Sequence, residues 1–169
     1  MRRLTEVLIL FISIFLLACC CDSGYHEIVI EPWDVLLVKL ENAWNTLNIP
    51  LLESCFRDDF LHHLQSQDWD DYDGDGIIDQ YWELEIELEF AENISTEADS
   101  IYFSFSGGES FIWSGDSTGQ SIQMLRILTR EICFPSDTTL EVRPVTLICR
   151  PDSQGEWYIW QWFDGEEQK

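Results

Sequence analysis

Positive charge is scarce in this chain. Its 169 residues include 9 lysines and arginines against 32 aspartates and glutamates, which gives a formal net charge of −23. A surface of that sign repels phosphate backbones, so the composition excludes nucleic acid as a partner. The six cysteines follow no zinc-ligand spacing. Acidic and aromatic residues are abundant instead, and an aromatic share of 14% supplies enough apolar surface for a folded core.

Long apolar runs are also missing, apart from one at the N-terminus. Residues 8–17 follow two arginines and form a run too short to span a bilayer comfortably. The run ends in Leu16-Leu17-Ala18-Cys19, which resembles the lipobox of bacterial lipoproteins, where a signal peptidase cuts before the cysteine. This resemblance implies a signal peptide over 1–18, a lipid such as palmitate on Cys19, and a lipid-anchored location on the exported face of a membrane in the bacterial cell envelope.

Some alternatives at this end stay open. An ordinary signal peptide or an uncleaved anchor also fits the apolar run. Cys20 and Cys21, directly after Cys19, could be acylated further, paired or uninvolved. We expect residues 19–30 to be a tether, 31–164 to form one domain and 165–169 to be a solvated tail.

Three further cysteines, Cys55, Cys133 and Cys149, follow the N-terminal segment. Export permits disulfides, but three is an odd number. A hairpin that turns near Asp137 would pair Cys133 with about Glu141, so we favour buried thiols over a Cys133–Cys149 bridge.

The domain begins with helical patterns. Apolar residues at helical spacing predict a helix from Pro32 to near Asn48 and a shorter one over 50–56. A short strand over 60–64 then carries His62 and His63, of which alternation sends only one inward.

Residues 82–90 alternate apolar and acidic side chains, as a strand does. In a strand, however, the four glutamates would share one face and place like charges side by side. Glutamate also favours helix over strand. We therefore predict a helix from about Gln80 to Asn93. Later alternating segments predict strands, in which Pro144 implies an edge or a bulge; these strands cover 101–105, 111–113, 122–134, 140–150 and 157–163.

The densest acidic stretch, 68–79, spaces its acids as a calcium loop does. In EF-hand loops, oxygen ligands come from positions 1, 3, 5, 7 and 9, and a glycine at position 6 makes the sharp turn. Hard oxygen donors without a thiol or an imidazole favour Ca²⁺ over Zn²⁺. The sequence therefore predicts a structural calcium ion, with Gly76 at the turn and ligands from Asp71, Asp73, Asp75, the Ile77 carbonyl and Asp79.

The loop departs from the EF-hand pattern at its last ligand. Position 12 is normally a bidentate glutamate, and here it is Trp82, with Glu83 one residue later. Glu83 could swing in with altered geometry, Asp68 or Asp70 could substitute, or water could complete the shell. We expect weak binding, with a Kd on the order of 10⁻⁴–10⁻³ M. A solvated acidic loop with tight turns is the alternative.

The order of these elements resembles a known superfamily. Residues 32–60 open with a long helix, a short helix and Arg57-Asp58-Asp59-Phe60, and the aromatic residues 157–164 close the chain. This pattern resembles the cystatin-like α+β superfamily that includes nuclear transport factor two, SnoaL-type cyclases and ketosteroid isomerase. The resemblance covers about residues 31–164 and points to uncharacterised bacterial lipoproteins of this fold. It implies helices packed in a curved antiparallel sheet that forms a cone, with the acidic loop at its rim.

Two functions follow as expectations. The first is a lipid-anchored binding or scaffold domain without enzymatic activity, which carries one structural Ca²⁺ and binds an unidentified small molecule or protein. The second, implied by the resemblance, is a small-molecule isomerase, cyclase or dehydratase of the SnoaL kind that uses His62 or His63 inside the cone as a general base. The acid and tyrosine set of the isomerase pattern cannot be placed from these residues.

Overall fold

The computed structural model describes residues 30–72, 75–113, 116 and 120–165. The expected signal peptide, the lipidation site Cys19 and the loop residue Asp73 lie outside the described residues. Contacts group residues 31–169 into one unit, apart from residues 1–30. In the described ranges, no helix is both long enough and apolar enough to cross a membrane.

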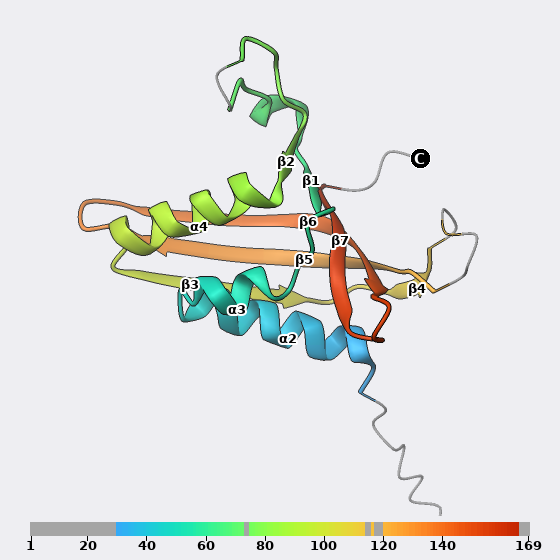
Figure 1. The fold of residues 1–169 in the computed structure, drawn as a ribbon. Coiled ribbons are helices and arrows are strands. Elements are labelled where there is room, and N and C mark those ends of the chain that lie inside the picture. The colour runs from blue at the N-terminus through green and yellow to red at the C-terminus, as the bar shows by residue number, and fades with distance from the viewer. Residues whose placement is uncertain (1–29, 73–74, 114–115, 117–119, 166–169) are drawn as a thin grey trace, which may run out of the picture. The chain divides into compact units, whose positions relative to one another are not determined.

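Helix α2 (Pro32–Asn45) covers the inner face of a sheet (Figure 1). The N–H groups of the first helical turn have no partner within the helix, so proline, which lacks an N–H, is tolerated there. Pro32 therefore favours a helix start at this point. The side chains of Leu40 and Trp44 are almost fully buried. At the end of the helix, the Asn45 amide exchanges two hydrogen bonds of 2.8 Å with the backbone of Phe103, so it occupies an open strand edge.

Helix α3 (Ile49–Glu53) follows after a tight connection in which Leu47 has φ 49. The Asn48 side chain accepts a hydrogen bond of 3.0 Å from Leu51 N and so caps the helix. The prediction of two consecutive helices is confirmed, although the first ends at Asn45 rather than near Asn48.

Helix α4 (Leu84–Glu97) is the helix expected over the alternating acidic segment. Its start differs from the prediction, because Tyr81–Glu83 form the short strand β2, which pairs with the preceding strand. Ala91 and Ile94 are buried, as an amphipathic helix requires. Glu87 is the exception among the helix's glutamates, since it is 3% exposed.

The strands form a seven-stranded curved sheet in the order β2-β1-β7-β6-β5-β3, with β4 paired to β5 (Figure 1). The β1–β7 pair is parallel, and the other pairs are antiparallel. Apart from β2, the strands are β1 (Leu61–His63), β3 (Ser100–Ser106), β4 (Ser110–Ile112), β5 (Ile122–Cys133), β6 (Thr138–Pro151) and β7 (Trp157–Asp164).

The long β5–β6 hairpin is tighter than expected. Cys133 pairs with Thr138, whereas Glu141 pairs with Arg130. The residues of β6 that pair with β7 begin at Val145. Pro144 comes directly before them, so it lies at the point where β6 no longer has β7 as a neighbouring strand. This placement agrees with the expectation for a proline in a strand.

The described cysteines Cys55, Cys133 and Cys149 are all free thiols. Cys149 pairs with Ile122, at the opposite end of the hairpin from Cys133. The register therefore keeps the two strand cysteines apart. Burial raises the pKa of the Cys55 thiol to about 11, so this group is an inert core residue at neutral pH.

The inner face of the sheet changes character along its strands. Met124, Leu128 and Leu147 are fully buried there beneath the helices. Farther along β5 and β6, the same alternation turns the charged side chains of Arg130, Glu141 and Arg143 inward, next to the apolar Ile132. This polar end of the inner face holds the site described next.

Candidate functional site

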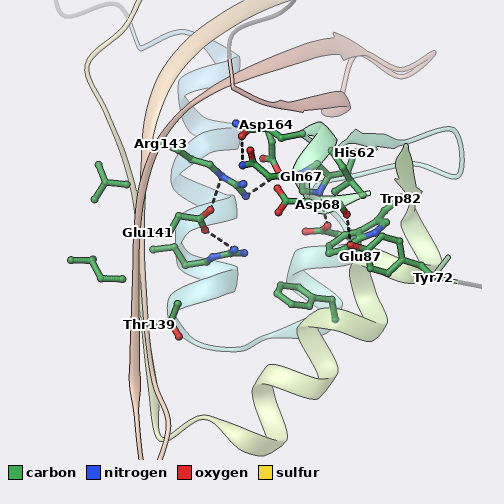
Figure 2. Close-up of a pocket in the computed structure, with 16 residues that line it drawn as sticks. His62, Gln67, Asp68, Tyr72, Trp82, Glu87, Thr139, Glu141, Arg143 and Asp164 are labelled. Atoms are coloured by element: carbon green, nitrogen blue, oxygen red, sulfur yellow. Dashed lines mark hydrogen bonds and ion pairs between the residues drawn. The ribbon is translucent and has the colours of Figure 1, made fainter. Parts of the chain in front are cut away.

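A pocket of ≈ 620 Å³ opens at the polar end of the inner face. Its walls come from β1, β2, α4, β5, β6 and β7, together with residues 64–72. Figure 2 shows Arg143 and Glu141 on one side of the pocket and Trp82, Tyr72 and Glu87 on the other. The site therefore combines segments from most of the domain's length.

Strand β1 positions the two histidines on opposite faces. His62 is 5% exposed and lines the pocket, whereas His63 stacks on Phe163, with ring centroids 4.2 Å apart and planes inclined by 3°. One of the two histidines thus reaches inside, as alternation requires, and that residue is His62.

His62 lies between two carboxylates. Its Nδ1 is 2.9 Å from Glu87 Oε2, and its Nε2 is 3.1 Å from Asp164 Oδ2. All three side chains are nearly inaccessible, at 6%, 4% and 2% exposure. A neutral imidazole can donate from one nitrogen only, so this arrangement favours the doubly protonated ring.

The ion pairs continue from Asp164 across β6. Asp164 Oδ2 lies 3.0 Å from Arg143 Nη2. Glu141 then joins two arginines, with Oε1 3.0 Å from Arg143 Nε and Oε2 2.6 Å from Arg130 Nη2. The result is a charge chain of three anions and three cations in alternation, defined here as Glu87, His62, Asp164, Arg143, Glu141 and Arg130.

The charge chain sets the protonation of its members. Burial alone would lower the pKa of His62, but Glu87 and Asp164 outweigh it and raise that pKa to about 9. Burial would likewise raise the pKa of Asp164, but His62 and Arg143 hold it below its usual range. At neutral pH, His62 is therefore an imidazolium and has no lone pair with which to accept a proton.

An aromatic wall faces the charge chain. Trp82 packs edge-on against Tyr72, with ring centroids 5.1 Å apart, and lies 5.5 Å from the Phe90 ring. The Arg130 guanidinium lies over the Phe90 ring, 5.5 Å from its centroid, so the charged and aromatic walls meet. All four side chains line the pocket.

The acidic loop borders the pocket through Asp68 and Tyr72. Its two ends meet where Asp79 N donates a hydrogen bond of 2.8 Å to Asp70 O. The Tyr72 hydroxyl donates to the backbone oxygen of Asp68, and Tyr72 N donates to Asp79 Oδ2 at 3.0 Å. The loop's own hydrogen bonds therefore hold Tyr72 at the rim of the pocket.

Backbone N–H groups occupy several of the expected calcium ligands. Asp71 Oδ2 accepts from Gly76 N at 3.0 Å, and Asp75 Oδ1 accepts from Ile77 N at 2.7 Å. Gly76 has φ 86, as the sharp turn at position 6 requires. Glu83 is exposed and belongs to β2.

One atom of the loop fits a cation. Asp71 Oδ1 is buried without a hydrogen-bond partner, and a hard cation would satisfy it. Within the described part of the chain, however, no three acidic, histidine or cysteine side chains converge in a metal-binding group. Asp73, which stands at position 3 of the expected loop, lies outside the described residues.

The sequence pattern predicts an inward histidine, but it does not by itself reveal the rest of the charge chain. Arg130 shares the inward positions of β5 with Met124 and Leu128, and Glu141 and Arg143 share those of β6. Charged side chains at positions that alternation assigns to the core are the signal that could have found them. Glu87 carries no such signal, because it lies among other glutamates in sequence, and Asp164 carries none because it ends its strand just before an acidic tail.

Known proteins resemble this chain in structure rather than in sequence. No protein-family model matches it, and no curated protein does. Among solved structures, a conserved protein from Planctomyces limnophilus gives a TM-score of 0.63 at 14% identity, over 78% of this chain and 91% of that one.

Two further structures carry functional descriptions. A putative scytalone dehydratase from Novosphingobium aromaticivorans gives a TM-score of 0.61 at 7% identity, over 79% of this chain and 80% of that one. A ketosteroid isomerase-like protein from Erwinia carotovora atroseptica gives 0.53 at 9% identity, over 80% and 94%. Identities this low show the fold alone. The chain has the α+β cone fold of the nuclear transport factor two-like and ketosteroid isomerase-like proteins, built on a curved sheet that does not close.

Proposed function

We propose that this chain is an exported, lipid-anchored domain that binds a small organic molecule in the pocket bounded by the charge chain and the aromatic wall. The supporting observation is that six charged groups converge on a cavity of ≈ 620 Å³. Each buried ion costs several kcal/mol to desolvate, and apolar residues would often serve a core equally well or better. A cavity with a few convergent polar groups beside aromatic side chains is the usual form of a small-molecule site.

Two neighbouring threonines allow a direct test of the pocket. Thr139 lines the pocket, whereas Thr138 lies one position away on the opposite face of β6; both are exposed. A panel of small aromatic acids, amines and amides is titrated while tryptophan fluorescence is recorded. Compounds that bind wild type should bind Thr138→Trp and fail with Thr139→Trp, because the new indole fills the cavity. Absence of binding by every compound, or equal loss in both variants, would overturn the proposal.

The lipid anchor is the part of the proposal that rests on the lipobox pattern ending in Cys19. Cleavage before this cysteine would free its amino group, and acylation would hold the domain at the exported face of the membrane. Wild type should fractionate with membranes, and its N-terminal peptide should carry the mass of acyl chains. Cys19→Ser should abolish both properties while Cys21→Ser retains them; retention of the acyl mass in Cys19→Ser would contradict this assignment.

The calcium ion is the third part. The oxygen donors of the loop and the unpartnered Asp71 Oδ1 support it. When bound, Ca²⁺ would link the two ends of the loop and thereby fix Asp68 and Tyr72 at the pocket wall. Glu83 would have to turn inward, or water would have to complete the shell. The ligands would be Asp71, Asp73, Asp75, the Ile77 carbonyl, Asp79 and this last donor.

A second candidate function is catalysis of a dehydration or an isomerisation. The observation that favours it is His62 between Glu87 and Asp164 at the pocket wall. Since His62 is protonated at neutral pH, it would act as an acid or hydrogen-bond donor, and Glu87 would accept the proton.

This candidate makes a separate prediction about turnover. A compound that binds the pocket and carries an acidic C–H beside a carbonyl should exchange that hydrogen with deuterated water only when the protein is present. Glu87→Gln should retain binding and lose at least about 100-fold in exchange rate, because its amide cannot take up the proton. Binding without any exchange in wild type would exclude the enzymatic role for that class of compound.

A further inference from the structure

We infer that the molecule bound by this pocket is an organic carboxylate with a flat apolar body, held through Arg130 and Arg143. The inference rests on the proposed binding function and specifies its ligand class. In the charge chain, most carboxylate acceptors already have partners, whereas the arginines keep N–H donors for a ligand.

The carboxylates of the charge chain are largely consumed. Asp164 accepts from Trp162 Nε1 at 3.0 Å through Oδ1, and its Oδ2 meets both His62 and Arg143. Both oxygens of Glu141 contact arginines. Glu87 keeps one oxygen beyond its contact with His62. Little acceptor capacity therefore remains for a cationic ligand.

The arginines, in contrast, retain donors. A guanidinium has five N–H groups in a rigid fork. Arg130 Nη2 donates to Glu141, and Arg143 Nε and Nη2 form ion pairs with Glu141 and Asp164, although Nε is buried and makes no aligned hydrogen bond. Among the described residues, Arg130 Nε and Nη1 and Arg143 Nη1 take part in no hydrogen bond or ion pair. None of these three atoms is among the buried unsatisfied ones, so they remain accessible to a ligand.

The arginines can bind a carboxylate by shape as well as by charge. Nε and Nη1 of Arg130 lie on different edges of the guanidinium, so two parallel hydrogen bonds would combine one of them with the second N–H of Nη2. Arginine binds carboxylate oxygens through two parallel hydrogen bonds, and such charge-assisted pairs are about twice as strong as neutral ones. Arg130 and Arg143 both contact Glu141, so their guanidinium groups lie close together and both reach the cavity.

The aromatic wall defines the rest of the ligand. Trp82 and Tyr72 present ring surface across the pocket from β6 (Figure 2). Phe90 also lines the pocket, with its ring 5.5 Å from that of Trp82. Aromatic rings contact other flat apolar groups at centroid distances of about 4.5–7 Å. A ligand with its ring against Trp82 and its carboxylate toward Arg130 would use both walls at once.

Negative charge elsewhere opposes this ligand. Asp68 lines the pocket outside the charge chain, and the whole protein carries a formal charge of −23. Salt screens charges beyond about 8 Å at physiological ionic strength, so the direct arginine contacts should outweigh the distant acids. Asp68 is near enough to weaken binding, and its removal should therefore strengthen it.

Three probes of matched shape test the inference: 2-naphthoate, 2-naphthamide and 2-naphthylmethylamine. Each is titrated into the protein at constant salt, and the Kd is measured by tryptophan fluorescence and calorimetry. We expect 2-naphthoate to bind at least about tenfold more tightly than the other two. Tighter binding of the amine or equal binding of the amide would overturn the carboxylate assignment while leaving the proposed binding function in place. Failure of all three would overturn both.

Charge variants provide the second arm. Arg130→Gln should weaken 2-naphthoate by about tenfold or more and leave 2-naphthamide almost unchanged. Arg126→Gln, on the same strand and face but outside the pocket, removes the same charge and should leave both probes unchanged. Asp68→Asn should tighten 2-naphthoate by about two- to threefold. Thermal melting confirms that each variant is folded. Equal weakening of the acid and the amide by Arg130→Gln would contradict the proposed contact.

Discussion

The acidic loop and the charge chain both concentrate charge, and they are organised in opposite ways. The loop gathers aspartates that are neighbours in sequence, and backbone N–H groups provide their described hydrogen bonds. The charge chain gathers single charges from β1, α4, β5, β6 and β7, and each anion meets a cation. Density of charge in sequence therefore does not locate the buried charges of this fold.

The same contrast predicts different energetic roles. The described side chains of the loop are exposed or half-buried, so water screens their repulsion. Those of His62, Glu87 and Asp164 are nearly inaccessible, so the loss of one partner leaves a buried charge uncompensated. Substitutions in the charge chain should consequently affect stability more than substitutions in the loop.

The largest effect is expected from His62→Gln. This change leaves Glu87 and Asp164 without their shared cation, and it should lower the free energy of unfolding by about 3–5 kcal/mol. The measurement is urea denaturation at pH 7. His63→Gln is the matched control, since that ring packs on Phe163 outside the charge chain, and it should cost about 1 kcal/mol or less. Similar losses in the two variants would show that the charge chain adds nothing to stability.

The next effect is the pH dependence of stability. The folded-state pKa of His62 is raised from 6.5 to about 9, so its contribution is complete below pH 6.5 and is lost as the pH rises through 9. A shift of this size corresponds to about 3 kcal/mol. Unfolding free energies measured between pH 6.5 and 9 should fall in wild type and stay nearly level in His62→Gln. A parallel decline in both proteins would assign the titration to another group.

The sequence could predict the helices, the strands and the loop because their signals are local. Apolar spacing identified α2, and glutamate preference correctly favoured helix over strand for α4. Pairing with β1, a tertiary contact, converted Tyr81–Glu83 into a strand, and a tighter hairpin changed the partner of Cys133 from Glu141 to Thr138.

Alternation marks Arg130, Glu141 and Arg143 as inward charges, but the assembly of the whole charge chain could not be predicted from the sequence, for a physical reason. Its members lie as far apart in sequence as His62 and Asp164, and only the parallel pairing of β1 with β7 brings those two together. That pairing also decides that His62 meets Trp162 on the inner face while His63 meets Phe163 on the outer one. Non-local register of this kind leaves no trace in the local pattern of residues.

The calcium loop should give a smaller effect. With a Kd on the order of 10⁻³–10⁻⁴ M, about 10 mM Ca²⁺ should stabilise the folded state by about 1.4–2.7 kcal/mol, and EDTA should remove this gain. Asp73→Asn with Asp75→Asn should abolish the response, whereas Glu85→Gln with Glu89→Gln, two exposed acids of α4, should retain it. The melting temperature is the readout. If Ca²⁺ does not raise the melting temperature of wild type, or raises it equally in both double variants, the loop binds no calcium and is a solvated turn.

The smallest effect concerns the turn of the loop and separates its backbone from its ligands. Gly76 has φ +86, and a Cβ there meets nothing within 4 Å, so Gly76→Ala costs only backbone strain of about 1 kcal/mol. Gly107→Ala, at φ +61 and equally uncrowded, should lose a similar amount and keep the full calcium response. Gly76→Ala should also weaken that response, because Gly76 N donates to Asp71 Oδ2 and a strained turn would displace this carboxylate. Calcium titrations of the melting temperature in both variants decide the matter, since an unchanged response in Gly76→Ala would show that the turn does not organise the ligands.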